Sequence, residues 1–167
     1  VMGKTVVLFA EYGFGDALQC LRFASSFKQR GARVFIDCRK PLHRLFAAQP
    51  YVDGVADSDE TGPIAHDFYA PLMSLPHVFG TALNTIPRDI PYLRTVPGTE
   101  APPIIATAPG LKIGLVWAGD PAQRGDRQRS MGVEQFEPLF EISNVSWFSL
   151  QVGHGREQLT QHPTPIR

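Results

Sequence analysis

Short apolar runs alternate with helix-like segments through the first part of the chain. Thr5–Ala10 is a continuous apolar and β-branched run, which is typical of a strand buried on both faces of a parallel sheet. Between Ala17 and Gly31 the apolar side chains recur at helical spacing, at Cys20, Leu21, Ala24 and Phe27. Arg33–Cys38 is a second apolar run. The pattern predicts a βαβ unit with a right-handed crossover.

The next segments are shorter and are separated by turn-forming residues. Leu42–Gln49 lies between two prolines and predicts a short helix, and Val52–Ala56 predicts a third strand. Asp57–Pro63 is acidic and rich in turn residues. His66–Leu72 predicts a fourth strand, and Met73–Pro76 is expected to be the loop that follows it.

A change in composition divides the chain. Residues 97–110 are rich in proline and nearly uncharged, which predicts a linker between a first domain, residues 1–96, and a second domain, residues 111–167. In the second domain, Lys112–Ala118 and Val145–Val152 are expected to be strands. Val133–Ile142 is expected to be an amphipathic helix interrupted by Pro138.

The predicted fold class is α/β. We expect a Rossmann-like, three-layer α/β/α domain with a parallel sheet, followed by the beginning of a second Rossmann-like domain. The second segment is close to the smallest size that can bury an independent core. We therefore expect the second domain to be truncated and the chain to be a fragment of a longer protein.

Composition narrows the functional classes. The 16 basic and 16 acidic residues cancel, so no overall charge attracts nucleic acid or an anionic membrane. No apolar run reaches the roughly 20 residues that span a bilayer, and no secretory signal is apparent at the start, so we expect a cytoplasmic protein without an integral membrane segment. The two cysteines, Cys20 and Cys38, are expected to be buried thiols. The five histidines lack metal-ligand spacing, so we expect no metal and no other cofactor.

The first candidate motif is a glycine loop between the first predicted strand and helix. Gly13 and Gly15 would permit close backbone approach and positive φ angles, but Leu18 replaces the third glycine of a dinucleotide fingerprint. Asp16 has two interpretations, as an N-cap of the helix or as a general base for an acceptor hydroxyl. Ser74 is a weaker candidate, because it follows a predicted strand.

The second candidate motif is basic. Arg124, Arg127 and Arg129 lie within six residues after a predicted strand, and Ser130 precedes the predicted helix. The segment is either a solvated charged loop or a phosphate site, since arginine binds phosphate oxygens bidentately. Asp126 is a candidate to orient an arginine or to cap the loop. Gln151, near the end of the last predicted strand, is a further candidate.

Four segments together carry a resemblance to a known family. They are EYGFGDALQ, PLMSLP, IPRDIPYL and GLVWAGDPAQRGDRQRS, and the last is the most specific. The chain resembles the glycosyltransferase-like region found behind tetratricopeptide repeats in bacterial proteins. That region is similar to the ADP-heptose:lipopolysaccharide heptosyltransferases, in glycosyltransferase family 9.

The resemblance implies a GT-B architecture of two Rossmann-like domains with the active site between them. The N-terminal domain would bind a sugar or protein acceptor, and the C-terminal domain a nucleotide-diphospho-sugar. Asp16 occupies the position of the family's proposed base, and Arg127, Arg129 and Ser130 lie in the segment that contacts donor phosphates. The implied activity is metal-independent, inverting glycosyl transfer. The family's later donor motif is not among these residues, so this chain alone is expected to have an incomplete donor site.

A second hypothesis is not enzymatic. A Rossmann-like module attached to tetratricopeptide repeats could serve as a binding or scaffold element for a protein partner. The residues alone leave both hypotheses open.

Overall fold

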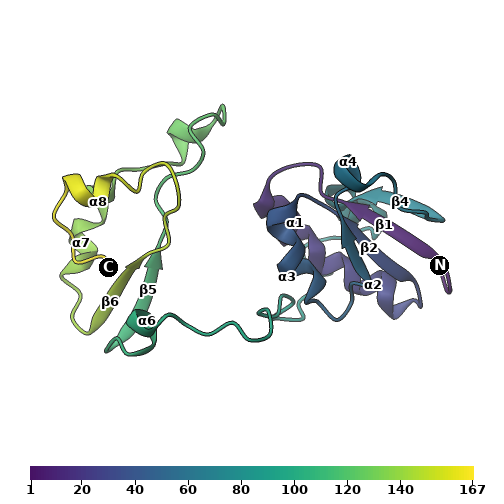
Figure 1. Ribbon diagram of the computed structural model, residues 1–167, viewed down its shortest axis with the longest axis horizontal. Coiled ribbons are helices and arrows are strands. Elements are labelled where there is room, and N and C mark those ends of the chain that lie inside the picture. The colour runs from purple at the N-terminus through teal and green to yellow at the C-terminus, as the bar shows by residue number, and fades with distance from the viewer. The chain divides into compact units, whose positions relative to one another are not determined.

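The computed structural model describes residues 1–167 and divides into two compact units (Figure 1). The N-terminal unit comprises Val1–Thr99 and the C-terminal unit Glu100–Arg167. Each unit contains its own parallel β-sheet, with four strands in the first and two in the second. The chain is therefore an α/β protein. None of its helices has the length and apolar character needed to cross a membrane.

The four strands of the N-terminal unit are all parallel, in the spatial order β3-β2-β1-β4. Their bounds are β1 Thr5–Phe9, β2 Arg33–Asp37, β3 Gly54–Ala56 and β4 Phe68–Pro71. All four agree with the predicted strands to within a few residues at either end. The central strand β1 is the one predicted to be buried on both faces, and three of its five residues are fully buried.

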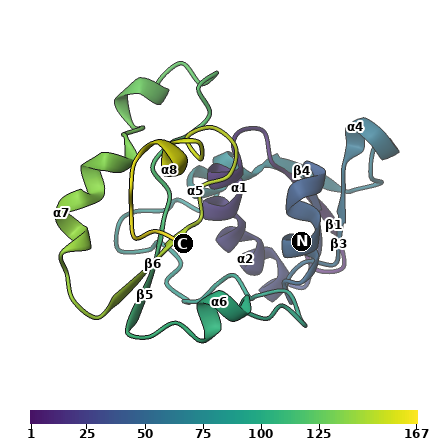
Figure 2. The same ribbon diagram turned by 60° about the vertical axis from the view of Figure 1, so that its left-hand side comes forward.

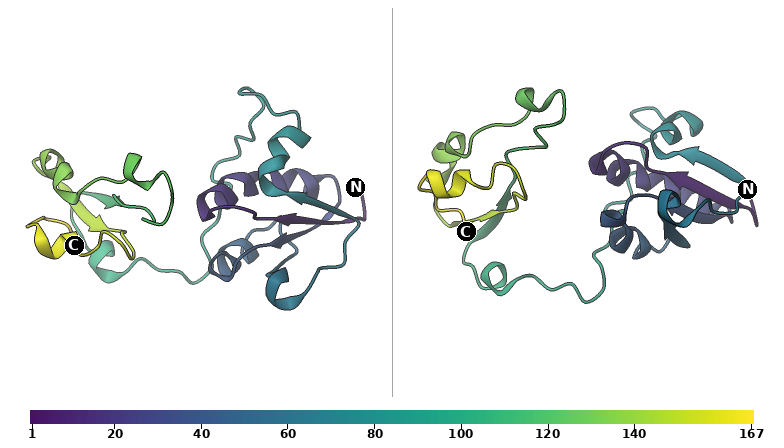
Figure 3. Two further views of the ribbon diagram at one scale, coloured as in Figure 1. Left: turned by 90° about the horizontal axis from the view of Figure 1, so that it is seen from above. Right: turned by 45° about the horizontal axis from the view of Figure 1, so that its top comes forward.

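Helices cover one face of this sheet (Figures 1 and 3). The predicted first helix is one helical stretch, formed by α1 Phe14–Cys20, the 3-10 turn η1 Leu21–Phe23 and α2 Ala24–Gln29. The 3-10 turn η2 Lys40–Leu42 then leads into α3 His43–Ala47. Their apolar stripes pack against Val6, Leu8, Val34 and Ile36, which alternate along β1 and β2. The main hydrophobic core lies in this layer.

The other face of the sheet carries a different set of side chains. Val7 lies in register with Phe35 on one side and Tyr69 on the other, so these three side chains share a face. The rings of Phe9 and Tyr69 stack, with centroids 4.6 Å apart and planes 2° from parallel. Tyr69 is still 56% exposed. This face therefore presents aromatic rings to its surroundings.

The segment after β4 is helical, whereas the sequence predicted a loop at Met73–Pro76. Leu72–Ser74 forms the 3-10 turn η3 and Leu75–Val78 forms α5. Proline is compatible with this helix because Pro76 stands in its first turn, where the missing N–H needs no partner. Leu72 and Leu75 are buried in the core, and this burial fixes the helical turn.

The C-terminal unit is built on β5 Leu111–Leu115 and β6 Val145–Ser149, which pair in parallel. Its helical elements are α6 Pro103–Ala106, the 3-10 turns η4 Asp126–Gln128 and η5 Val133–Phe136, α7 Glu137–Phe140 and α8 Gln158–Gln161. The core gathers Trp117, Trp147 and Val133, with Phe140 and Leu159 against it. Figure 2 shows β5 and β6 side by side in this unit. Both tryptophans are buried core residues.

Several boundaries in this unit differ from the prediction, and the expected strand Val145–Val152 ends at Ser149. The expected strand Lys112–Ala118 ends at Leu115, because the N–H groups of Trp117 and Ala118 donate to a side chain and not to a neighbouring strand. The expected helix Val133–Ile142 is a 3-10 turn followed by α7, and Pro138 stands in the first turn of α7. Residues 97–110, expected to be a linker, contain α6.

The turn before β5 requires glycine for two reasons, and this makes a testable prediction. Gly110 has a φ of +67°, and a Cβ there would collide with the backbone carbonyl oxygen of Asn144. Gly153 has a similar φ of +73° but open space around it. Replacing Gly153 by alanine is expected to cost about 1 kcal/mol, the strain of a positive φ alone.

Gly110→Ala is expected to lower the unfolding free energy of the C-terminal unit by at least about 2 kcal/mol more than Gly153→Ala, since the backbone must also move away from Asn144. Denaturation followed by tryptophan fluorescence measures the difference, because both tryptophans, Trp117 and Trp147, belong to this unit. Equal losses for the two variants would show that the carbonyl contact is unimportant.

Candidate functional site

The glycine loop after β1 leads directly into α1. Gly13 is the N-cap residue of α1, with a φ of −71°. Neither Gly13 nor Gly15 has a positive φ, so the positive φ angles expected for this loop are absent. Asp16 is the third residue of the helix and not its N-cap. Its Oδ2 accepts a hydrogen bond of 3.2 Å from the Gly13 N–H. Part of its carboxylate therefore stabilises the helix start, and the half-buried side chain keeps some exposure.

Ser74 lies on an element that contacts α1. The η3 turn that ends at Ser74 packs against α1, and Cys20 Sγ lies 3.5 Å from Met73 Sδ. The structure thus brings the segments of Asp16 and Ser74 together on one side of the unit. The Ser74 hydroxyl makes no hydrogen bond within the chain, and it is half-buried.

A pocket of about 690 Å³ opens at the carboxyl end of the N-terminal sheet. The residues directly after β1, Ala10, Glu11 and Tyr12, line it, and so do the residues after β2 and β3. The full set is Val7, Phe9, Ala10, Glu11, Tyr12, Asp37, Cys38, Arg39, Asp57, Ser58, Asp59, Pro63, Ile64, His66 and Tyr69. Ligands of open parallel sheets bind at this edge, and the volume is that of a small-molecule site.

The pocket is acidic. Of its four carboxylates, only Asp37 has partners: it accepts hydrogen bonds from the backbone N–H and the hydroxyl of Ser58, at 2.9 and 2.5 Å. The Oε2 atom of Glu11 is buried and has no hydrogen-bond partner. Arg39 is the pocket's only arginine or lysine, and its Nη2 donates to the Tyr12 carbonyl oxygen at 3.1 Å.

Both cysteines are buried free thiols that form no disulfide bond, and their burial was predicted. Burial, and after it the charges of Asp37 and Asp57, raise the pKa of the Cys38 thiol to about 12. Burial is also the main cause that raises the pKa of Cys20, with Asp16 next. Both side chains are therefore neutral thiols near pH 7, so neither acts as a thiolate nucleophile there. No cluster of His, Cys, Asp and Glu is arranged to hold a metal ion.

In the C-terminal unit, Ser130 and Asp126 form hydrogen bonds and an ion pair that hold the basic segment in place. The Ser130 hydroxyl accepts a 2.9 Å hydrogen bond from the Gly119 N–H and donates one of 2.6 Å to Asp126 Oδ1. Asp126 is only 7% exposed, and its Oδ1 lies 3.8 Å from Arg129 Nε. Asp126 thus orients an arginine, one of the roles foreseen for it.

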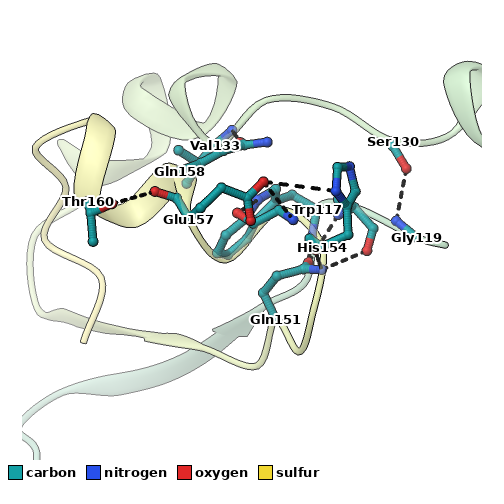
Figure 4. Close-up of polar contacts among 11 residues, drawn as sticks. Trp117, Gly119, Ser130, Val133, Gln151, His154, Glu157, Gln158 and Thr160 are labelled. Carbon is teal, nitrogen blue, oxygen red and sulfur yellow. Dashed lines mark hydrogen bonds and ion pairs between the residues drawn. The ribbon is translucent and has the colours of Figure 1, made fainter. Parts of the chain in front are cut away.

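The Gln151 side chain makes more hydrogen bonds to the backbone than that of any other candidate residue. The side chain is 5% exposed. Its Oε1 accepts from the N–H groups of Trp117 and Ala118 at 3.0 and 3.1 Å. Its Nε2 donates to the carbonyl oxygens of Ala118 and His154 at 2.8 and 2.6 Å (Figure 4). The amide has no hydrogen-bonding capacity left for a ligand phosphate.

Arg124 and Arg127 differ from these inward-facing residues. Both are exposed, and neither forms an ion pair or a side-chain hydrogen bond within the chain. The five phosphate candidates therefore divide into two groups. Three are engaged within the unit, since Ser130 and Gln151 hydrogen-bond the backbone at residues 117–119 and Arg129 Nε lies 3.8 Å from Asp126 Oδ1. Arg124 and Arg127 present unengaged guanidinium groups to solvent.

Comparisons with protein-family models, with curated proteins and with solved structures found no match to this chain.

The pocket contains residues that the motifs did not indicate. Arg39, Asp59 and Tyr69 belong to no recognisable motif, and Glu11 and Tyr12 lie in the segment EYGFGDALQ but were not among the predicted site residues. One signal could have found several of them, because Glu11, Asp37 and Asp57 lie at or just after the ends of three strands that prove to be neighbours. Carboxylates in that position meet at one edge of a parallel sheet.

Proposed function

We propose that the chain belongs to a GT-B glycosyltransferase that transfers a sugar from a nucleotide-diphospho-sugar to an acceptor hydroxyl with inversion. In this proposal each unit represents a Rossmann-like domain, the first of three-layer type. The N-terminal unit binds the acceptor, and the C-terminal unit contacts the donor. The sequence resemblance gives the reaction class, and two parallel sheets in separate units are compatible with that architecture.

One observation carries the acceptor assignment. The loop that follows β1 lines the 690 Å³ pocket through Glu11 and Tyr12, and its next residue, Gly13, is hydrogen-bonded to Asp16. A pocket and a partly exposed carboxylate are therefore joined by one short loop. A pocket wall of aromatic rings and carboxylates suits a ring that carries hydroxyl groups, since rings contact its apolar face and carboxylates accept its O–H donors.

Asp16 would act as the general base in this reaction. Its carboxylate would take the proton of the acceptor hydroxyl as the oxygen attacks the anomeric carbon, while the bond to the nucleoside diphosphate breaks. Charge then develops on the leaving diphosphate. Arg124 and Arg127 are the guanidinium groups of the basic segment that are free to contact that charge, because they have no partners within the chain.

The donor assignment is tested by titrating the chain with ADP and UDP and following backbone amide shifts by NMR. We expect shifts concentrated in residues 119–130, and about a tenfold loss of affinity in Arg127→Ala, which removes one charge-assisted contact to phosphate. Arg156→Ala is the matched control, because Arg156 is exposed and makes no side-chain contacts in the same unit. Shifts spread evenly over the chain, or equal losses in both variants, would contradict the assignment.

A non-catalytic binding module is the second candidate, and one observation favours it. Ser130 and Gln151, two residues of the donor set, are engaged in holding the fold. A module of this kind would keep the pocket and bind its ligand, with or without a protein partner, but would transfer nothing. Turnover by the protein that contains this chain separates the two candidates.

A further inference from the structure

The pocket in the N-terminal unit contains carboxylates without partners, and these indicate the class of ligand that it would bind. Glu11, Asp57 and Asp59 line the pocket, and none of their carboxylates accepts a hydrogen bond or forms an ion pair within the chain. Asp59 is exposed, but Glu11 Oε2 is buried. A carboxylate partly shielded from water and without a partner is costly as an anion, so a donor that reaches its other oxygen, Oε1, from the pocket would be bound favourably.

The cations of the chain near the pocket are already engaged. Arg39 donates to the Tyr12 carbonyl oxygen, and its guanidinium lies 5.0 Å from the centre of the Phe14 ring. Lys40 forms an ion pair of 2.6 Å with Glu60. His66 Nδ1 lies 2.6 Å from the carbonyl oxygen of Ile64. None of these groups forms an ion pair with Glu11, and the four carboxylates of the lining outnumber its one guanidinium, Arg39, so the pocket retains a net negative charge.

The geometry does not suit a bare metal ion. No three His, Cys, Asp or Glu side chains are close enough to bind one ion, although four carboxylates line the pocket. An organic cation is different, because its body can span carboxylates that stand apart. The aromatic wall adds a second attraction, since the stacked Phe9–Tyr69 pair leaves Tyr69 56% exposed and Tyr12 is 63% exposed.

We propose that this pocket binds a ring that bears a protonated amine, with the ammonium group at Glu11 and the ring against the aromatic wall. This deepens the proposed function and rests on it only in identifying the ligand as the acceptor, which would then be an amino sugar. The pocket would reject an anionic acceptor, because a phosphate or carboxylate would face three unneutralised carboxylates.

The test compares ligands that differ in one group. The chain is titrated at pH 7 with glucosamine, glucose and N-acetylglucosamine, and amide shifts of the pocket residues are followed by NMR. We expect glucosamine to bind about tenfold more tightly than the two neutral sugars, the effect of one charge-assisted hydrogen bond. Equal affinities, or shifts outside the pocket, would overturn the proposal.

Variants assign the preference to named groups. Glu11→Gln keeps the side-chain shape and removes the charge, so the preference for glucosamine should fall about tenfold while glucose binding changes little. Asp59→Asn, at an exposed position that the fold does not need, should reduce the preference by a smaller factor. Glu100→Gln, exposed and outside the pocket, is the matched control and should leave it unchanged. An unchanged preference in both pocket variants would contradict the proposal.

Cyclohexylamine separates this inference from the proposed function. If it binds in the pocket as tightly as glucosamine, the amine-binding pocket is supported and the sugar acceptor is not. If glucosamine is preferred over cyclohexylamine and over glucose, both are supported. If all three sugars bind equally, the amine inference fails and sugar binding remains.

Discussion

Replacing Gln151 by leucine is expected to unfold the C-terminal unit. Leucine has nearly the volume of glutamine, so the change removes hydrogen bonds and leaves packing almost intact. Two backbone N–H groups and two backbone carbonyl groups lose the partner that now satisfies them. Each unsatisfied buried group costs about 1–3 kcal/mol, and we expect a total loss of about 3–5 kcal/mol after relaxation and entry of water.

A unit of this size has little stability to lose. Small domains bury a small fraction of their surface, and their unfolding free energy is a few kcal/mol. Denaturation followed by tryptophan fluorescence reports on this unit alone, because the N-terminal unit contains no tryptophan. Gln161→Leu makes the same chemical change at an exposed position on α8 and should leave the transition in place.

The same experiment decides between two roles for Gln151. If the residue served only to bind donor phosphate, Gln151→Leu would leave the denaturation midpoint unchanged and weaken nucleotide binding. Gln151→Glu adds a further check. Glutamate keeps both acceptor contacts but places a carboxylate against the carbonyl oxygens of Ala118 and His154, so it too should be strongly destabilising.

The fold was predictable where the sequence carries a regular pattern. The strand at Thr5–Phe9 and the helical stripe through Cys20 and Phe27 follow from apolar spacing, because burial on a sheet or a helix imposes a period. The turn at Met73–Pro76 was predicted as a loop, since proline discourages helix in general. Its helical form depends on the burial of Leu72 and Leu75, and no local sequence pattern predicts that burial.

The candidate site likewise has a part that the sequence could predict and a part that it could not. The corner at Asp16 was predictable, because a glycine loop between strand and helix is a local feature. The pocket was not, since its carboxylates come from three strands whose neighbourhood only the sheet order reveals. The structural role of Gln151 also depends on distant residues, because its partners at Trp117 and Ala118 lie 34 and 33 positions away in the sequence.

The largest expected effect on activity belongs to Asp16. If the chain acts in the proposed glycosyltransferase, Asp16→Asn is expected to lower kcat by about 10²–10⁴-fold, the usual contribution of a general base. Donor and acceptor binding should change little, since the side chain keeps its size. The measurement is release of nucleoside diphosphate at saturating donor, with binding of donor and acceptor followed separately.

Asparagine is the informative replacement because it separates chemistry from structure. Its Oδ1 can still accept the Gly13 N–H that Asp16 Oδ2 accepts now, so the helix start is retained apart from a charge effect of about 0.3–1 kcal/mol. Asp16→Ala also removes the hydrogen bond and should cost about 1 kcal/mol of stability in addition. Gly15→Ala is the control, since a Cβ there would meet open space; it should leave turnover unchanged and raise stability by about 0.4–1 kcal/mol.

The pattern across the three variants identifies the role of the carboxylate. A general base predicts that Asp16→Asn and Asp16→Ala are equally inactive although only the second is clearly destabilised. A residue that only caps the helix predicts the opposite order, with Asp16→Asn close to the wild type in turnover and Asp16→Ala impaired in proportion to its lost stability. Because the cap survives in Asp16→Asn, full turnover by that variant would leave Asp16 as a structural residue and remove the base from the proposed mechanism.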